Sequence, residues 1–189
     1  MLIDQPRARR ILGLALPIMA AMVSQSALNL VDIAMVGLLG DAAIAAVGLS
    51  SFTLFTFQSL ILGLSTGVQA MAARRKGEGR LNETATVLNG GLLLSLVLAP
   101  PLSLLLIWIA PLLMPLLNAD PAVIEAAVPY FQIRAAAALF LCSNYCFRGY
   151  WNAVDLSRLY MWTLILIHAS NIILNSILIF GHFGAPAMG

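Results

Sequence analysis

Long apolar segments separated by short polar stretches dominate the chain. Each of the five segments exceeds the roughly 20 residues that a helix needs to cross a hydrocarbon core of about 30 Å. Because lipid offers no partner for backbone polar groups, and the strict alternation of a barrel strand is missing, each segment is expected to be a helix. The pattern therefore predicts an all-α membrane protein with five transmembrane helices, at residues 11–39, 42–73, 84–117, 121–147 and 159–181.

Charged residues lie mostly in the connections between these segments. Nine of the ten Lys and Arg residues precede the first segment or lie between segments two and three or four and five. The opposite connections carry Asp41, Asp120 and Glu125 but no Lys or Arg. Basic residues favour the cytoplasmic side of a membrane, so we expect a cytoplasmic N-terminus. Five spans then leave residues 181–189 (GHFGAPAMG) on the outer side.

Composition agrees with a lipid environment. The chain is 61% hydrophobic and 10% charged, whereas a soluble domain carries roughly 25% charged residues. A basic face with interleaved aromatic residues is missing, which argues against nucleic-acid binding. Walker, GxGxxG, HExxH and GxSxG motifs are also missing, so we do not expect an enzyme.

Two cysteines, Cys142 and Cys146, lie four residues apart in the fourth apolar segment. On a helix they share one face, but their Cα atoms are too far apart for an unstrained disulfide. We interpret them as small packing residues. A metal pair is the less favoured alternative, because no further cysteine joins them and the two histidines are distant.

A carboxylate lies inside the first apolar segment. Asp32 is about eight residues, or roughly 12 Å along a helix, from the outer connection. Gln25 and Asn29 fall within about 60° of it around the helix. A short Asp side chain does not reach the surface from this depth, so the stripe is expected to line a polar cavity, with packing against a neighbouring helix as the alternative. Burial favours the neutral carboxyl and a bound cation favours the ionised one, which predicts a coupling role for Asp32.

Other segments add candidate cavity residues. On the fifth segment, His168, Asn171 and Asn175 share one face within about 60°. Histidine alone more often packs than binds, but two asparagines on its face favour a polar lining. The remaining candidates are the cavity residues Thr56 and Ser59, a helix bend at Pro17, close packing at Gly63 and Gly67, and a structural Arg134 partnered by Glu125 or a carbonyl.

Four stretches together resemble the multidrug and toxic compound extrusion (MATE) family, in order along essentially the whole chain. The resemblance implies twelve helices in two six-helix lobes around a central cavity with alternating access. Only helices one to five are matched, which implies an N-terminal lobe truncated before helix six, its C-terminal lobe absent. The stretches are ALPIMAAMVSQSALNLVDIAMVGLLGDAAIAAVGL (15–49), GLSTGVQAMAARRKGEGR (63–80), YFQIRAAA (130–137) and NIILNSILIFGHFGAPAMG (171–189).

The resemblance also implies a function. Family members are antiporters that export small organic cations and toxic compounds in exchange for protons or sodium, so we expect a bacterial inner-membrane transporter with H⁺ or Na⁺ as coupling ion and no cofactor. Asp32 matches the first-helix aspartate that the DinF-like branch uses for proton coupling, and Asn171 matches its fifth-helix asparagine. Asn175 departs from the pattern, since some proton-coupled members have aspartate there. An amide cannot titrate, so Asp32 would act nearly alone within this lobe.

The expected mechanism is that protonation of Asp32 rearranges the stripe of Gln25, Asn29 and Asp32 and bends the first helix near Pro17, which expels the substrate. Two alternatives stay open. A flippase of the same superfamily, moving a lipid-linked precursor, would need a more cationic cavity, for which Arg134 is the candidate. A non-transporting membrane subunit that assembles with partners is the other.

Overall fold

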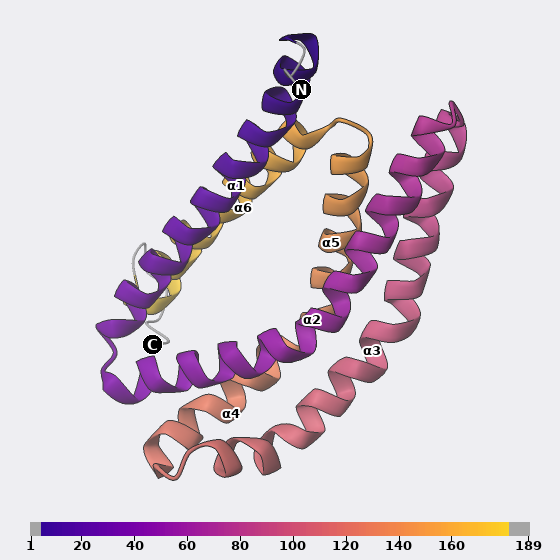
Figure 1. The fold of residues 1–189 in the computed structure, drawn as a ribbon. Helices are drawn as coiled ribbons and strands as arrows, with labels where there is room; N and C mark the ends of the chain where they lie inside the picture. Colours follow the sequence, from indigo (N-terminus) through magenta and orange to yellow (C-terminus); the bar gives the residue numbers. More distant parts are fainter. Residues whose placement is uncertain (1–4, 182–189) are drawn as a thin grey trace. The chain divides into compact units, whose positions relative to one another are not determined.

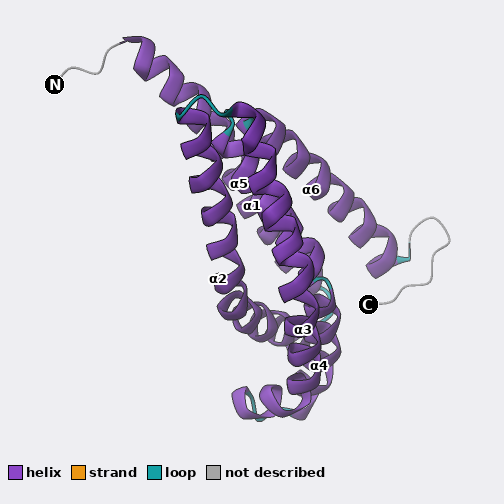
Figure 2. Ribbon diagram, turned by 90° about the vertical axis from the view of Figure 1, so that its right-hand side faces the viewer, coloured by secondary structure: helices purple, strands orange, loops and turns teal. Residues whose placement is uncertain are grey.

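The computed structural model describes residues 5–181, and every regular element in that range is a helix (Figure 1, Figure 2). The predicted all-α class is confirmed. Four helices are long and apolar enough to cross a membrane, and α4 with α5 makes a fifth span if the bent pair counts as one. Residues 182–189 of the predicted outer tail lie outside the described residues. The elements are α1 (Gln5–Gly37), α2 (Asp41–Gly77), the short 3-10 helix η1 (Leu81–Glu83), α3 (Thr84–Leu117), α4 (Pro121–Ala136), α5 (Ala138–Ala153) and α6 (Ser157–Phe180).

The fourth predicted helix is broken in two. The sequence predicts one helix over residues 121–147, but α4 and α5 meet at Ala137 with a bend of 51°. Residues 130–148 contain neither proline nor glycine. Instead, the Ser103 hydroxyl of α3 donates to the carbonyl oxygen of Ala135, at 2.8 Å, beside the break. A side chain that occupies a helix carbonyl is a known cause of kinks, so the neighbouring helix explains the bend better than the local sequence does.

The helices form two compact units, described separately: unit 1 holds α1 and α6, and unit 2 holds α2 to α5. In unit 1 the two helices pack side by side (Figure 1). Gln25 contacts His168 and Asp32 contacts Asn175, and both pairs are 143 residues apart in sequence. Positions therefore rise together along both helices, so α1 and α6 are parallel. The two contacts are seven residues apart, which is about two turns.

The face of α1 toward α6 continues this spacing. Pro17 is buried, Ala21 is 0% exposed and Leu28 is 8% exposed. Steps of four and seven residues keep one stripe of a helix against a parallel partner, as in a coiled coil. We call this contact the α1–α6 seam; its polar members are Ser24, Gln25, Asn29 and Asp32 on α1 and His168, Asn171 and Asn175 on α6.

Unit 2 packs its helices through small residues. Gly149 of α5 lies so close to α2 that an added Cβ would be 2.3 Å from the carbonyl oxygen of Ser65. At Gly91 of α3 an added Cβ would be 2.6 Å from a methyl group of Val68. The predicted close packing at Gly63 and Gly67 has no partner within unit 2: a Cβ there would meet nothing within 4 Å, because this face of α2 points away from α3, α4 and α5.

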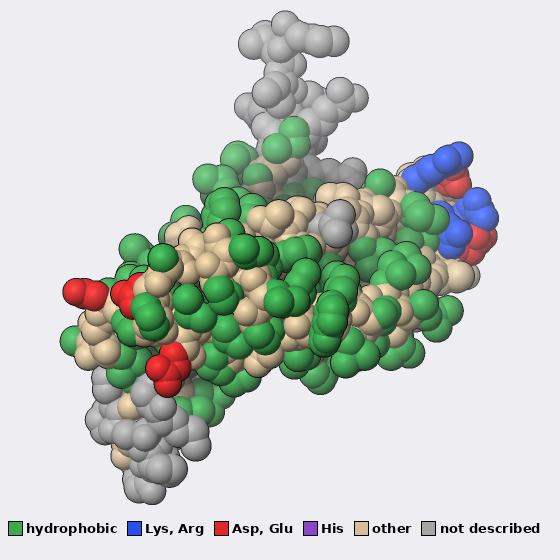
Figure 3. Space-filling view, turned by 90° about the horizontal axis from the view of Figure 1, so that it is seen from below, with side chains coloured by type: hydrophobic (Ala, Val, Ile, Leu, Met, Phe, Trp, Pro, Cys, Tyr) green, Lys and Arg blue, Asp and Glu red, His purple; other side chains and the backbone are tan. Residues whose placement is uncertain are grey.

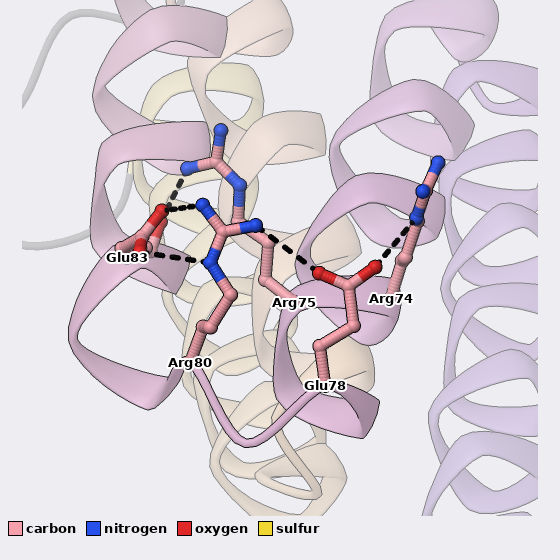
Figure 4. A network of polar contacts seen from close by, with 5 residues as sticks. All are labelled: Arg74, Arg75, Glu78, Arg80 and Glu83. Carbon is pink, nitrogen blue, oxygen red and sulfur yellow. Dashed lines mark hydrogen bonds and ion pairs between the residues drawn. The ribbon is translucent and has the colours of Figure 1, made fainter.

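The α2–α3 connection is held by an exposed ionic network (Figure 4). Glu78 accepts from Arg74 at 2.8 Å and from Arg80 at 3.2 Å, and Arg80 also pairs with Glu83. Arg75 donates to the backbone oxygen of Glu83 at 2.7 Å. The hydrogen bonds from Arg74 and Arg80 lower the pKa of Glu78, and the bond from Arg80 lowers the pKa of Glu83.

Large apolar side chains are spread over the face seen in Figure 3, and many are exposed. Leu116, Phe140 and Ile133 are 82%, 77% and 73% exposed. An exterior of this kind is compatible with lipid and unstable in water. Within unit 2 the basic cluster lies at the α2–α3 connection, while Asp41 and Asp120 lie at the opposite helix ends, where α2 and α4 begin. Apart from Arg134, the charged side chains described for this unit thus lie toward its two ends.

Candidate functional site

An acid and two amides are in contact at the α1–α6 seam. Nδ2 of Asn175 donates to Oδ1 of Asp32 and to Oδ1 of Asn171, both at 3.0 Å. A primary amide has two hydrogens, so both bonds form at once. All three side chains are half-buried. The polar stripes predicted on the first and fifth segments therefore meet here.

Two turns toward the N-termini, a histidine joins the same two helices. Nδ1 of His168 lies 2.7 Å from Oγ of Ser24, and Nε2 lies 3.2 Å from Oε1 of Gln25. Gln25 in turn donates from Nε2 to Oδ1 of Asn29, at 3.2 Å. His168 is only 5% exposed, so these protein groups, rather than bulk water, satisfy its ring.

The seam is rich in oxygen atoms and poor in basic groups. Neither residues 11–37 nor residues 159–180 contain Lys or Arg. Carboxylate and amide oxygens are the ligands that hard cations prefer, and a carboxylate is also a group to which a proton binds. The arrangement around Asp32 can therefore hold either a proton or a small cation.

The other predicted residues are placed differently. Thr56 and Ser59 lie on α2 in unit 2, where their hydroxyls donate to carbonyl oxygens of their own helix, those of Phe52 (3.3 Å) and Thr56 (2.6 Å). Their place in the cavity of Gln25 stays a prediction. Pro17 is buried within α1, which continues as one helix from Gln5 to Gly37, and its role in bending stays a prediction as well.

Ser24 is the seam residue that the sequence analysis missed. Its hydroxyl makes the 2.7 Å contact with His168. The missed signal is the spacing of Pro17, Ala21, Ser24 and Leu28, which follows the steps of four and three residues of a parallel helix contact. A neutral serine in an apolar segment attracts less attention than a carboxylate, so only this spacing identifies it.

Arg134 on α4 has other partners than Glu125. Its guanidinium donates to the hydroxyl of Tyr130 at 2.7 Å and to the hydroxyl of Ser51 at 3.4 Å, and lies 5.5 Å from the centre of the Tyr130 ring. The predicted pairing with Glu125 is wrong because nine residues at about 100° each place the two side chains on opposite faces of the helix.

The cysteines belong to the interior of unit 2. Cys142 and Cys146 are both buried and free. Sγ of Cys146 lies 3.4 Å from Oγ of Ser95, and it packs against Gly91. In residues 5–181 no three side chains of His, Cys, Asp or Glu gather as a metal site. These contacts give the pair a place in helix packing.

Comparison with known proteins identifies the family. The MatE family model matches residues 17–177. A probable multidrug resistance protein NorM from Burkholderia mallei is 32% identical over 178 residues, which are 93% of this chain and 38% of that protein. Multidrug resistance protein PmpM from Pseudomonas aeruginosa is 31% identical over 185 residues, 96% of this chain and again 38% of the relative.

Solved structures agree. An outward-facing multidrug resistance MATE family transporter of the MOP superfamily superposes with a TM-score of 0.86 and 28% identity, over 93% of this chain and 39% of that chain. The chain thus spans about two fifths of the length of the relatives it matches. Its apolar helices and these relatives make it a multi-pass membrane protein. The chain belongs to the MatE family and corresponds to the N-terminal part of its transporters.

Proposed function

We propose that this chain is the N-terminal lobe of a secondary antiporter that exports small organic cations and toxic compounds in exchange for protons or sodium. The observation that carries the proposal is the contact between Asp32 of α1 and Asn175 of α6, in a chain of the MatE family. A carboxylate held between two membrane helices by a neutral amide has two states of different charge, which is what ion coupling requires.

The coupling step takes place at Asp32. In the ionised state Oδ1 of Asp32 accepts a hydrogen bond from Nδ2 of Asn175, and the nearby amide oxygen of Asn171 adds a neutral ligand for a sodium ion. Protonation removes the negative charge and turns one carboxyl oxygen into a donor. The bond to the amide then loses its charge-assisted part, which weakens the hold of α1 on α6.

Pro17 is the proposed place where α1 responds. A proline has no backbone N–H, so the carbonyl of Gly13 lacks its usual helical partner and the helix is locally weak. A change in the seam, which lies C-terminal to Pro17, bends α1 and so alters the proposed transport cavity. Thr56 and Ser59 of α2 are the hydroxyls that we propose for the lining of this cavity. Catalysis plays no part in this sequence of events.

The proposed location is the bacterial inner membrane with a cytoplasmic N-terminus. Support comes from the charge distribution, since Arg74, Arg75 and Arg80 cluster at the α2–α3 connection and acids mark the opposite end of unit 2. The central cavity needs a second lobe, which longer relatives have room for. The partners are therefore a C-terminal lobe, membrane lipid and the exported cation.

The test is export of a fluorescent organic cation by the complete transporter that carries this lobe, reconstituted in vesicles with either a proton or a sodium gradient. We expect Asp32→Asn to lower gradient-driven export at least tenfold, while Glu125→Gln, which neutralises an exposed acid of α4, leaves it unchanged. Equal export by Asp32→Asn and wild type would remove the coupling role. Failure of the wild-type transporter to export any cation under either gradient would favour a flippase or a non-transporting subunit.

A further inference from the structure

His168 is the titratable group of the seam that the coupling step does not use. It is one of two histidines in the chain, and it lies seven residues before Asn175 on the same face of α6. Both ring nitrogens have partners on α1, and the residue is 5% exposed. A histidine that only fills space would not need two cross-helix hydrogen bonds.

The partners define which nitrogen carries the hydrogen. Oε1 of Gln25 is an amide oxygen and can only accept, so Nε2 of His168 donates to it. In the neutral ring Nδ1 is then the acceptor, and the Ser24 hydroxyl donates to it at 2.7 Å. The neutral ring is thus fully bonded in one tautomer.

The same partners also suit the charged ring. When Nδ1 gains a proton it becomes a donor, and a hydroxyl oxygen can accept as well as donate. Rotation about the Cβ–Oγ bond of Ser24 turns its hydrogen away from the ring and its lone pair toward Nδ1–H. The hydroxyl hydrogen can then bond to the carbonyl of Ala20, four residues earlier, as Ser26 already donates to the carbonyl of Met22 at 3.2 Å.

From this geometry we propose that His168 is a second proton-binding group of the α1–α6 seam, with Ser24 as the residue that lets Nδ1 take up a proton without breaking either contact to α1. The proton enters the Nδ1 lone pair, and no heavy atom has to change its partner. This inference deepens the proposed function, because it adds a proton site to the same network.

The electrostatic surroundings fit such a site. Within unit 1 α1 packs against α6, and the carboxylate of α1 in the seam, Asp32, lies seven residues beyond Gln25, about two turns from the ring. On α6 the other ionisable side chains, Arg158 and Tyr160, lie at least two turns before His168. A positive ring and a negative Asp32 offset each other's charge, so one transferred proton need not leave a net charge in the seam.

Protonation of His168, bonded to Ser24, has a different effect on the seam from protonation of Asp32. At Asp32 a proton weakens a charge-assisted bond between the helices, whereas at His168 it leaves both bonds in place and strengthens them. The proposed role of His168 is therefore to hold a proton while α1 and α6 stay together. Gln25 links this site to Asn29 through its amide.

The test is a histidine NMR titration of the 189-residue chain in lipid nanodiscs, with nitrogen-labelled histidine. The chain has two histidines, so the variant His168→Gln assigns the signal of the seam. We expect the His168 ring to be the neutral Nε2–H tautomer at about pH 8 and to become imidazolium reversibly as the pH falls to about 5. A ring that stays neutral at pH 5, or that carries its hydrogen on Nδ1 at pH 8, would overturn the proposal.

Ser24 variants separate a proton site from a packing residue. Ser24→Ala removes the acceptor for Nδ1–H, so we expect the proton affinity of the ring to fall about tenfold, as for the loss of a hydrogen bond to a charged group. Ser24→Thr keeps the hydroxyl and should titrate within about threefold of wild type. Ser26→Ala, which removes a hydroxyl bonded within α1, is the matched control and should not move the titration. Equal titration in Ser24→Ala and wild type would contradict the role given to Ser24.

Failure of this inference is distinct from failure of the proposed function. The ring signal reports proton binding whether or not the complete protein transports. If Asp32→Asn abolishes export but the ring never takes up a proton, only the assignment of His168 fails. If the ring titrates as expected but Asp32→Asn exports like wild type, only the coupling role of Asp32 fails.

Discussion

In unit 2 three buried serine hydroxyls donate to backbone carbonyls, whereas in unit 1 the polar side chains of the seam bond to one another. Ser50, Ser95 and Ser103 donate to the carbonyls of Ala127 (3.3 Å), Gly91 (2.9 Å) and Ala135 (2.8 Å). In the seam, by contrast, Asp32 and His168 contact side chains of the other helix. A hydroxyl–carbonyl bond does not respond to pH, while the bonds of an acid and an imidazole do. These buried serine contacts of unit 2 are therefore insensitive to pH, whereas the seam contacts of unit 1 depend on the protonation of Asp32 and His168.

Gly149→Ala should have the largest effect, on the stability of unit 2. The new Cβ would meet the backbone oxygen of Ser65 at 2.3 Å, and a backbone atom cannot easily move aside. We expect a loss of about 3 kcal/mol, or a melting temperature lower by roughly 6 to 12 °C in detergent. Gly63→Ala is the control, since a Cβ there has nothing within 4 Å. Equal melting of the two variants would show that unit 2 is not closely packed.

Asn175→Ala should affect ion coupling more than stability. It removes a hydrogen bond to a carboxylate, worth about 1.5 to 3 kcal/mol when the acceptor is charged. We expect gradient-driven export by the complete transporter to fall roughly tenfold, with a smaller fall in melting temperature than in Gly149→Ala. Ser170→Ala, an exposed position on α6, is the control. If the variant loses much stability but its export depends on the ion gradient as in wild type, the seam has a packing role, like the interior of unit 2, and not a coupling role.

Ser103→Ala should act on the break between α4 and α5. The variant leaves the Ala135 carbonyl without its hydroxyl donor, at a cost of about 1 to 2 kcal/mol in unfolding free energy. We expect a smaller bend at Ala137, measured as a longer distance between spin labels at the two ends of the pair. An unchanged distance would mean that the bend does not depend on α3.

The ionic network at the α2–α3 connection should give the smallest effect, a pH-dependent one. The pKa values of Glu78 and Glu83 are lowered from their ordinary 4.5, so the folded chain binds fewer protons than the unfolded chain near that pH. Stability from these groups is present above about pH 4.5 and is lost as the pH falls through the lower folded values. The melting temperatures of wild type and Glu83→Gln should therefore differ at pH 7 and approach each other as the pH falls to 3.5. Salt at 0.5 M should reduce the difference at pH 7, because the groups are exposed; a difference that persists in salt would contradict this origin.

The sequence predicts the helices and their polar faces well, because both depend on local spacing. Asp32 with Gln25, and His168 with Asn175, fall on single faces at about 100° per residue. Which residues meet across the seam depends on the offset of 143 residues between the helices, and nothing in either segment alone encodes that offset.

Local sequence patterns also failed to predict which faces of the helices pack together. The glycine pair at Gly63 and Gly67 looks like a contact motif, but which face of α2 is covered depends on where α5 lies, and α5 approaches at Ser65 through Gly149 instead. The break at Ala137 likewise follows from a hydroxyl on α3. Long-range contacts of this kind leave no mark in the broken segment itself.

The equal offset of the two polar contacts has a consequence for how α1 can move. Any rotation or slide that separates Asp32 from Asn175 also separates Gln25 from His168, since a rigid helix carries both residues together. A partial displacement of α1 along α6 would break both contacts without forming either one again. The helix pair should therefore switch between two states, one with both contacts formed and one with both broken, with few intermediates. A single ion-binding event would then change the contacts over two turns of α1 cooperatively.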